Sequence, residues 1–268
     1  MNKTSQAFNR VAPIYDQWAN LQKTVGEEIL ERVQWLKTTP RHILDVGTGT
    51  GNLTKGLSQL YKNADIYAID IAPKMLQQVS IPTQHLICAD AVQLPIADAS
   101  IDLLVSNLML QWCEDIPTVF TEFARVLKPK GAMFFSTFGP DTLRELRNSW
   151  NDEIAHVNNF ADMHNIGDAL LQADLLDPVM DVDWFELTYK EVKHLLLDLK
   201  NIGSHNKQYR SGLTGKHNFQ NMLKTYEQYR DNNGLLPATY EIIYGHALSK
   251  QLPSNTIPIH QVNDLINE

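Results

Sequence analysis

The chain has 268 residues, 43% of them hydrophobic, and a formal net charge of −8. This length and hydrophobic content allow one large core, and the negative charge argues against a general nucleic-acid binder, because neutralising phosphates needs a basic face. The sequence has no apolar stretch long enough to span a bilayer and opens without a signal peptide, so we expect a cytoplasmic protein without membrane contact. Its cysteines, Cys88 and Cys113, and its nine histidines lack ligand spacing, which predicts no disulfide framework and no metal site.

The first 40 residues precede the first predicted strand and are expected to form a helical arm. Residues 7–18 are aromatic and amphipathic, and residues 25–36 repeat apolar side chains at helical spacing until Pro40 ends the helix. Two interpretations of the arm remain open. It is either a helix packed on the edge of a sheet or a lid that covers a bound ligand with Tyr15.

Residues 42–54 are the most informative stretch, because a short apolar run breaks into alternating glycines and then becomes helical. Gly47, Gly49 and Gly51 lack Cβ atoms where the backbone must turn tightly and approach a ligand closely. The helix that follows presents unpaired N–H groups. The pattern predicts a strand that leads into a nucleotide-binding loop, although a plain structural turn is the alternative.

The acid inside this stretch narrows the class of ligand. A dinucleotide fingerprint would place its third glycine where Asn52 stands and would not require Asp45 at the end of the strand. A carboxylate two residues before the first glycine would repel phosphates, so Asp45 favours a cationic amino-acid ligand over a pyrophosphate. We therefore predict that the loop binds S-adenosylmethionine.

Two further apolar runs end at acids. Residues 66–69 end at Asp70, about 20 residues past the glycine loop, where an open α/β sheet places the acid that binds both ribose hydroxyls. Residues 85–88 lead to Asp90, which we expect at the adenine. Parallel strands end at one edge of the sheet, and ligands bind along that edge. The predicted cofactor contacts also include Ile71 and Ala91.

The middle of the chain continues the alternation of strands and helices. Residues 101–106 form a fourth predicted strand that brings Asn107 and Leu108, two further predicted cofactor contacts, to the same edge. Residues 117–127 are predicted to be helical, and residues 132–138 form a fifth, doubly buried strand. Five such alternations without an internal repeat predict a doubly wound α/β fold.

The last third is less regular. We expect a helix over residues 161–173, strands over 184–189 and 240–248, a helical insert over 190–236, and a frayed polar tail from Gln251. The whole chain, residues 1–268, is therefore predicted to be a single domain with a mostly parallel seven-stranded sheet and a helical insert before the last strand.

These motifs resemble the class I S-adenosylmethionine-dependent methyltransferases over nearly the whole chain. Three more selective blocks, residues 106–112, 199–203 and 237–245, are similar to the malonyl-acyl-carrier-protein O-methyltransferases of biotin synthesis. Thr48 and Thr50 stand where relatives often carry Cys and Pro, a departure that leaves the glycines free. Two supporting blocks lie at 139–146 and 157–160.

The resemblance implies transfer of a methyl group to the free carboxylate of a malonyl thioester, carried either by an acyl-carrier protein or by coenzyme A. A carboxylate is ionised at neutral pH, so its oxygen attacks without loss of a proton and no general base is expected. Catalysis then depends on alignment, an effect worth up to ~7–11 kcal/mol in favourable cases. The methyl donor is a cation and the acceptor is an anion, so their charges cancel as they react. A dry aromatic pocket favours such a step. Tyr15, Trp18 and Trp112 are the predicted walls, with a core tryptophan as the alternative interpretation of Trp112.

The resemblance also implies a partner, an acidic acyl-carrier protein that carries the thioester. Residues 190–230 hold eight basic residues against three acidic ones, which predicts a docking surface on the insert that includes Lys207 and Lys216. A solvated helical face is the alternative. We expect Gln111 to contact the substrate, and the residues predicted to pair with its carboxylate are Arg144, Lys200 and Arg210.

Three other functions remain open. A related methyltransferase would act on a quinone ring or small acid, with a shorter or more apolar insert. A protein-arginine hydroxylase and respiratory-complex assembly factor resembles the chain around residues 139–146 and 157–160. The last alternative is a non-enzymatic partner protein that only binds the cofactor, and the complete set of acids at Asp45, Asp70 and Asp90 argues against it.

Overall fold

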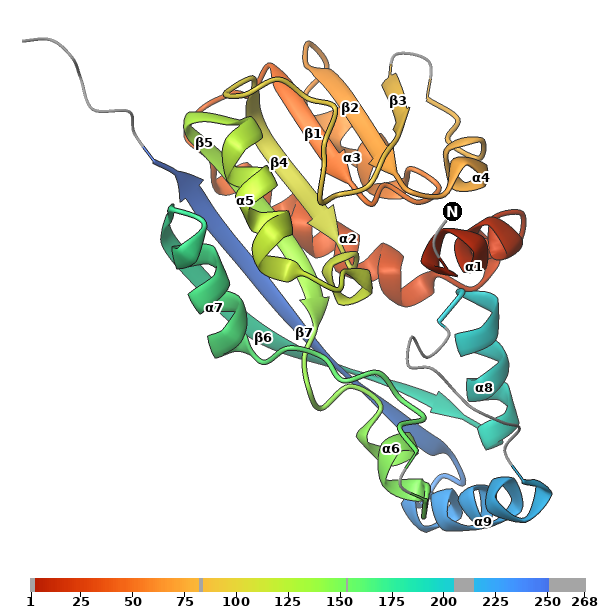
Figure 1. Cartoon of the computed structure of the whole chain (residues 1–268). Coiled ribbons are helices and arrows are strands. Elements are labelled where there is room, and N and C mark those ends of the chain that lie inside the picture. The colour runs from red at the N-terminus through yellow and green to blue at the C-terminus, as the bar shows by residue number, and fades with distance from the viewer. Residues whose placement is uncertain (1–2, 82–83, 153, 205–214, 251–268) are drawn as a thin grey trace, which may run out of the picture.

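A twisted seven-stranded sheet with the strand order β3-β2-β1-β4-β5-β7-β6 runs through the computed structural model (Figure 1). The first five strands are parallel, β7 is antiparallel to β5, and β6 is antiparallel to β7. This arrangement confirms the predicted mostly parallel sheet. The strands are β1 (His42–Val46), β2 (Asp65–Asp70), β3 (Gln84–Cys88), β4 (Ile101–Asn107), β5 (Leu127–Phe138), β6 (Leu175–Tyr189) and β7 (Leu236–Ser249).

The structure describes residues 3–81, 84–152, 154–204 and 215–250. The predicted tail from Gln251 therefore lies outside the described residues, as do Lys207 and Arg210. The helices are α1 (Lys3–Val11), α2 (Asn20–Arg32), α3 (Asn52–Leu60), α4 (Pro73–Leu76), α5 (Ile116–Val126), α6 (Arg144–Ser149), α7 (Met163–Gln172), α8 (Val192–Asn201) and α9 (Lys216–Tyr226), and the 3₁₀ turns are η1 (Tyr15–Gln17), η2 (Val33–Trp35), η3 (Leu110–Trp112) and η4 (Glu227–Tyr229).

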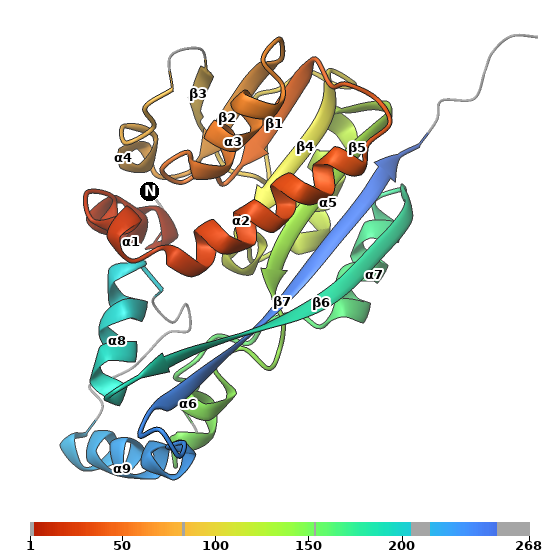
Figure 2. The ribbon, with the colours of Figure 1, turned by 180° about the vertical axis from the view of Figure 1, so that it is seen from behind.

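Helices cover both faces of the sheet, because its central strands are apolar on both sides. Ile43 of β1 packs into one core with Val25 of α2 and Leu57 of α3. Its neighbour Leu44 packs into the opposite core with Phe120 of α5 and Leu170 of α7. Figures 1 and 2 show these helix pairs on opposite sides of the sheet. Burial on both faces explains why β1 and β4 are continuous apolar runs.

Strand β6 is longer than the sequence predicted, since it begins at Leu175 rather than at residue 184. It is the edge strand of the sheet, and its register with β7 shifts between Leu176 and Val179. Acids such as Asp181 interrupt its apolar pattern, but the Asp181 carboxylate pairs with both terminal nitrogens of Arg32 on α2 at 2.9 Å. Charged side chains are common on exposed edge strands, where they discourage pairing with another chain.

The insert between β6 and β7 contributes α8 and α9, in agreement with the predicted helical character. Helix α8 lies beside α1 of the N-terminal arm, and α9 lies with α6 at the opposite end of the molecule from the first strands (Figures 1 and 2). Among the described residues, no helix combines the length and apolar character needed to cross a bilayer.

Gly245 of β7 provides a test of the packing between β7 and its neighbour β5. A Cβ at this position would lie 2.3 Å from Cζ of Phe135, a ring that is 1% exposed. We expect Gly245→Ala to lower the free energy of unfolding by about 1–3 kcal/mol, as overpacking does. Urea unfolding measures this change. Gly215→Ala is the control because a Cβ there meets no atom of the described residues within 4 Å, and equal stabilities of the two variants would contradict the packing argument.

Candidate functional site

A cavity of about 890 Å³ opens at the carboxyl ends of the parallel strands. It lies where β1 stands between β2 and β4, the point at which the strand order reverses and where open α/β sheets bind ligands. Its size is typical of cofactor sites. The cavity is lined by residues from the N-terminal arm, from the carboxyl ends of β1 to β4 and from the end of α8. Among them are Lys3, Phe8, Tyr15, Gly47, Gly49, Asp70, Ile71, Asp90, Ala91, Asn107, Leu108, Gln111, Trp112, Ile202 and Ser204.

The glycine loop after β1 needs its glycines for two reasons. Gly47, Gly49 and Gly51 all have positive φ angles, of 80°, 56° and 87°, a region that favours glycine. A Cβ on Gly47 would lie 2.4 Å from Cγ of Met109, so the loop could not approach η3 as closely. Gly51 caps α3 in the left-handed conformation and is not among the residues that line the cavity, so its predicted cofactor contact stays a prediction.

Asp45 is not among the residues that line the cavity. It is 1% exposed, and its Oδ2 accepts a hydrogen bond from the Thr54 hydroxyl at 2.5 Å, while the Thr48 and Thr54 hydroxyls lie 2.6 Å apart. Its Oδ1 has no hydrogen-bond partner among the described residues. Burial raises the pKa of Asp45 to about 6, against the opposing effect of the threonine hydrogen bonds. Through these hydroxyls Asp45 joins both ends of the glycine loop, and its predicted contact with the cofactor stays a prediction.

Asp70 lies at the carboxyl end of β2 and lines the cavity. Its Oδ2 accepts a hydrogen bond from the Gly49 N–H at 2.9 Å, and its Oδ1 accepts one from the Ala72 N–H at 2.7 Å. Burial raises the pKa of Asp70, while these two bonds lower it. A carboxylate oxygen has more than one lone-pair site, so both oxygens can accept a further hydrogen bond from a ligand hydroxyl.

The other predicted cofactor residues also lie in the lining. Ile71 follows Asp70, and Asp90 with Ala91 follows β3 on the neighbouring side of the cavity. The Asp90 carboxylate accepts only a long hydrogen bond, of 3.3 Å, from the Val92 N–H among the hydrogen bonds of the described residues. Its oxygens therefore have capacity to accept a ligand amine.

The end of β4 is fixed by hydrogen bonds before it reaches the cavity. Asn107 donates to the Gln22 carbonyl of α2 at 2.8 Å and accepts from the Ser136 hydroxyl at 2.8 Å. Leu108 has a positive φ of 47°, and its N–H donates to the Ser136 hydroxyl. Gln111 donates to the Leu108 carbonyl at 2.5 Å, so the predicted substrate contact lies in the lining with part of its amide already bonded.

Aromatic residues close one side of the cavity. Phe8 of the arm packs edge-on against Trp112, with ring centroids 5.2 Å apart, and against Tyr15 at 6.4 Å. Burial, followed by the charges of Asp70 and Asp16, raises the pKa of the Tyr15 hydroxyl. Trp112 and Tyr15, two of the predicted walls, line the cavity together with Phe8, which the sequence did not single out. Trp18, the third predicted wall, is not among the lining residues.

The arm is tied to the cofactor loops by hydrogen bonds that the sequence did not indicate. Asp16 Oδ1 accepts from the Thr50 hydroxyl at 2.6 Å and from the Asn52 amide at 3.1 Å, and we call this pair of bonds the arm–loop bridge. Ser5 donates to the Ile71 carbonyl at 2.9 Å. Thr50 had been noted only as a departure from related sequences. Its partner lies 34 residues away, and no local pattern connects the two.

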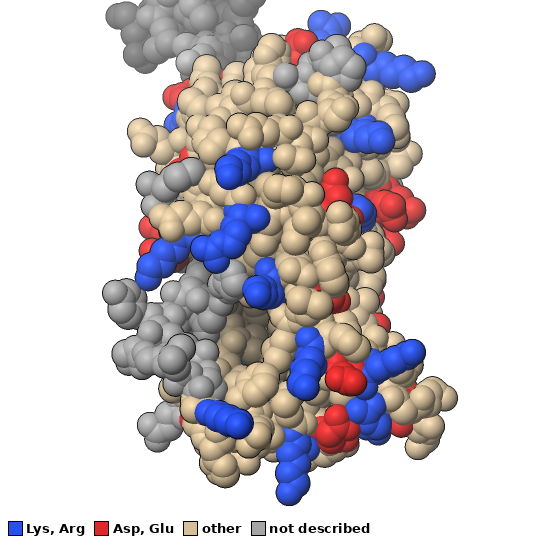
Figure 3. All heavy atoms as spheres, turned by 90° about the vertical axis from the view of Figure 1, so that its right-hand side faces the viewer, with Lys and Arg blue, Asp and Glu red and all other residues tan. Residues whose placement is uncertain are grey.

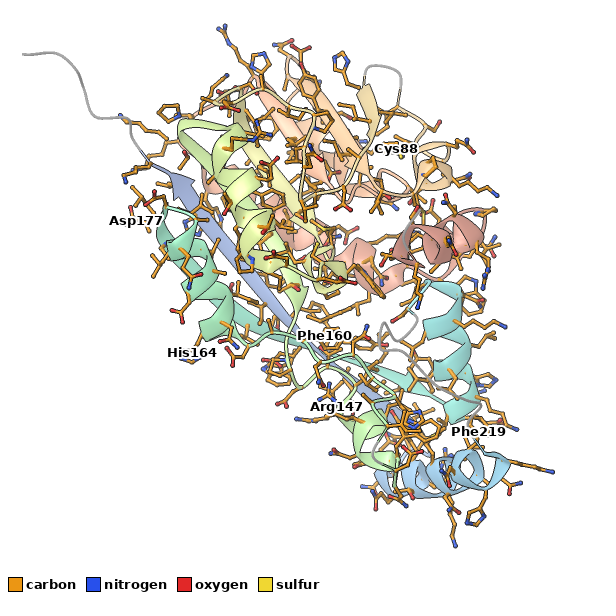
Figure 4. All side chains as sticks on the ribbon, viewed as in Figure 1. Cys88, Arg147, Phe160, His164, Asp177 and Phe219 are labelled. Atoms are coloured by element: carbon orange, nitrogen blue, oxygen red, sulfur yellow. The ribbon has the colours of Figure 1, made fainter. Side chains whose placement is uncertain are left out.

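Of the residues predicted to pair with the substrate carboxylate, Arg144 and Lys200 are described, and neither lines the cavity. The Arg144 side chain is 52% exposed, 3.4 Å from the Glu145 carboxylate and over the Trp184 ring. Figure 4 shows its helix α6, with Arg147 labelled, near Phe219 of α9 and away from the glycine loop. Lys200 is exposed at the end of α8 and does not line the cavity. Neither Arg144 nor Lys200, both expected to pair with the acceptor carboxylate, is therefore among the residues that line the cavity.

The cavity carries acidic side chains and one lysine among its described lining residues. Lys3 of α1 is this lysine, and no pattern in the sequence pointed to it. The acids in the lining are Asp70, Asp90, Glu114 and Asp115. Within the described ranges, no group of three His, Cys, Asp or Glu side chains is arranged to hold a metal ion.

Comparison with known proteins assigns the family. A family model described as a methyltransferase domain matches residues 44–135. The malonyl-[acyl-carrier protein] O-methyltransferase of Methylovorus sp. (strain MP688) is 43% identical, over 96% of this chain and 93% of its own. The enzyme of the same name from Gallionella capsiferriformans (strain ES-2) is 45% identical, over 90% of this chain and 88% of its own.

Solved structures share the fold at low sequence identity. The YcgJ protein from Bacillus subtilis has a TM-score of 0.59 and 13% identity, over 84% of this chain and 100% of its own. Phosphoethanolamine N-methyltransferase 2 of Haemonchus contortus, solved with S-adenosyl-L-methionine, has a TM-score of 0.52 and 15% identity, over 84% of this chain and 52% of its own. The sequence relatives show that the chain belongs to the malonyl-[acyl-carrier protein] O-methyltransferase family of S-adenosylmethionine-dependent methyltransferases.

The buried Asp45 predicts an unusual dependence of stability on pH. Its pKa of about 6 in the folded protein lies above the unfolded value, so the folded state holds the proton more tightly. The resulting stabilisation is complete at acidic pH and is lost as the pH rises through about 6. Relative to Asp45→Asn, the wild-type free energy of unfolding should fall by about 1–2 kcal/mol between pH 5 and pH 7.5.

Urea unfolding at the two pH values measures this difference, and comparison with the variant cancels the titration of other groups. Asp65→Asn is the matched control, because Asp65 is exposed at the opposite end of β2. Parallel pH profiles for the wild type and Asp45→Asn would show that the Asp45 carboxyl is not the group responsible.

Proposed function

We propose that the chain transfers the methyl group of S-adenosylmethionine to the free carboxylate of a malonyl thioester on an acyl-carrier protein, an early step of biotin synthesis. The observation that carries this proposal is a single cavity that joins a glycine loop and a buried acid to an aromatic wall. The names of the relatives support the acceptor and favour methyl transfer over the hydroxylase, quinone and non-enzymatic alternatives.

The residues at the inner end of the cavity fit the cofactor. Asp70, with Ile71, would hold the ribose, since its carboxylate is fixed by two backbone N–H groups and can accept further bonds. Gly47 and Gly49 would let the backbone approach the methionine part, because no atom lies within 4 Å of a Cβ built on Gly49. Asp90 and Ala91 would meet the adenine, and Asn107 and Leu108 would complete the contacts at the end of β4. When bound, S-adenosylmethionine supplies a methyl group activated by a positively charged sulfur.

The aromatic wall supports the chemistry in two ways. Phe8, Tyr15 and Trp112 line the cavity, where they would exclude water from the reacting groups, and aromatic ring faces attract a cation. The Tyr15 hydroxyl is protonated at neutral pH, as tyrosines ordinarily are, and burial raises its pKa further, so that it could donate a hydrogen bond to a carboxylate. Gln111 offers a second polar contact to the acceptor. The acceptor carboxylate is already ionised, so these residues orient it and none needs to remove a proton.

The two segments outside the parallel strands would have separate roles. The arm, residues 1–40, acts as a lid, which is supported by Phe8 and Tyr15 in the lining and by the arm–loop bridge. The insert, residues 190–236, acts as a cap toward the carrier, which is supported by Ile202 and Ser204 in the lining. Both belong to one methyltransferase domain, because each contributes side chains to the same cavity.

Binding of S-adenosylmethionine, measured by calorimetry, tests the cofactor assignment. Hydrogen bonds to charged groups contribute roughly 1.5–3 kcal/mol, so Asp70→Ala should weaken binding at least tenfold. Asp90→Asn should cost less, because the amide still accepts a hydrogen bond. Asp65→Ala, at the other end of β2, should bind as the wild type does. Unchanged affinity in Asp70→Ala would remove the ribose assignment.

Mass spectrometry of malonyl-acyl-carrier protein incubated with S-adenosylmethionine and this protein tests the reaction. We expect the mass of one methyl group on the malonyl thioester and none on an acetyl thioester, which lacks a free carboxylate. Equal methylation of both thioesters would place the methyl group elsewhere on the carrier. No methylation of either, with cofactor binding intact, would reject the proposed acceptor.

A further inference from the structure

We infer that the carrier docks on a basic surface formed by α1, α4 and α8 around the mouth of the cavity, and not on the insert alone. The inference rests on the proposed function and adds to it the face that receives the partner. The partner that fits this face is a protein with an acidic surface that presents a flexible thioester arm. We call this face the mouth surface. Its basic residues are Lys3, Arg10, Lys74, Lys193 and Lys200.

The three helices of the mouth surface are strongly basic for a chain whose net charge is −8. Together they carry five Lys or Arg residues and one acid, Asp198. Asp198 is hydrogen bonded to the Tyr189 hydroxyl of β6, so that its carboxylate is engaged with the sheet. An acidic partner is repelled by the protein as a whole, and a local reversal of sign gives it one favourable approach.

Spacing along the helices places these charges in two rows. Lys3 and Arg10 are seven residues apart on α1, and Lys193 and Lys200 are seven residues apart on α8. Seven residues are close to two helical turns, so each pair lies on one face of its helix. Val192 and Leu195 of α8 are buried, which leaves the lysine row exposed to solvent.

Contacts between the helices make the two rows one surface. The Lys74 N–H of α4 donates to the Asn9 side chain of α1 at 2.8 Å. A Cβ on Gly203, three residues after Lys200, would lie 3.3 Å from Phe8 and Val11 of α1. Figure 3 views this side of the molecule and shows basic side chains above, beside and below a hollow.

The cavity reaches toward this side of the molecule, since α1 and the end of α8 contribute to its lining. Lys3 and Phe8 from α1 and Ile202 and Ser204 from the end of α8 all line the cavity, so its opening lies between the two rows of basic residues. A carrier docked on both rows would hold its thioester arm over this opening. A nucleic acid or an anionic membrane would also be attracted by positive charge, but neither needs an opening that reaches Asp70 and Trp112.

Charge reversal on both rows tests the mouth surface. We expect Arg10→Glu combined with Lys193→Glu to lower kcat/KM for malonyl-acyl-carrier protein at least tenfold. For malonyl-pantetheine, which has no protein surface, kcat/KM should stay within twofold of the wild type. Salt should reduce wild-type activity on the carrier substrate but not on the small thioester, because the Debye length falls from ~10 Å at 0.1 M to ~3 Å at 1 M.

A matched control separates local docking from total charge. Lys37 and Lys62 are exposed and precede β1 and β2, at the amino edge of the sheet and opposite the cavity. Lys37→Glu with Lys62→Glu changes the net charge by the same amount and should leave both substrates unaffected. An equal loss in this control would reduce the effect to net charge and overturn the inference. A loss on both thioesters in Arg10→Glu with Lys193→Glu would assign these residues to folding or chemistry and also overturn it.

Fluorescence anisotropy of labelled malonyl-acyl-carrier protein decides the docking question independently of catalysis. Weaker binding by Arg10→Glu with Lys193→Glu than by the control supports the surface even if no methyl group is transferred, in which case only the proposed function fails. Equal binding by both overturns the mouth surface while methyl transfer stands. Binding to phosphatidylserine vesicles that is lost on reversal, with carrier binding unchanged, would make the face a membrane contact instead.

Discussion

The carboxylate of Asp70 is the constraint on which the rest of the site depends. One of its oxygens accepts the N–H of Gly49 and the other accepts the N–H of Ala72, so a single side chain joins the glycine loop to the turn that leads into α4. A buried charge is stable only when it is hydrogen bonded, and these two bonds provide that compensation. The ligand-binding edge of β1 and β2 is therefore fixed before any ligand arrives.

The arm depends on the same edge. Ser5 bonds to the Ile71 carbonyl, next to Asp70, and the arm–loop bridge joins Asp16 to Thr50 and Asn52 beyond Gly49. These contacts hold Tyr15 and Phe8 over the cavity, although the arm is far from both loops in the sequence. Displacement of the glycine loop would therefore also disturb the wall that faces the reacting groups. The arm and the two loops at the edge of β1 and β2 are linked through one set of hydrogen bonds.

The sequence predicted those parts of the molecule that depend on local patterns. The strands from β1 to β5, the glycine loop and the placement of Asp70 and Asp90 follow from short apolar runs and from the acids that end them. The bridge through Asp16, the position of Lys3 and the exposure of Arg144 depend on contacts between distant segments, which no spacing rule encodes. The early start of β6 was missed because an edge strand exposes acids such as Asp181, and these disrupt the apolar pattern.

The distribution of charge along the cavity explains how a negative protein can bring a cation and an anion together. Acids such as Asp70 and Asp90 line the cavity, with Asp45 one layer behind, so its inner end favours a positively charged ligand. The basic residues lie outside, on the helices around the opening, where they favour an acidic partner. The aromatic wall stands between the two regions and holds no formal charge of its own. Under the proposed function, a carboxylate that enters from the basic side would meet a cation held on the acidic side, beside the aromatic wall, and a reaction between opposite charges is favoured where water is excluded.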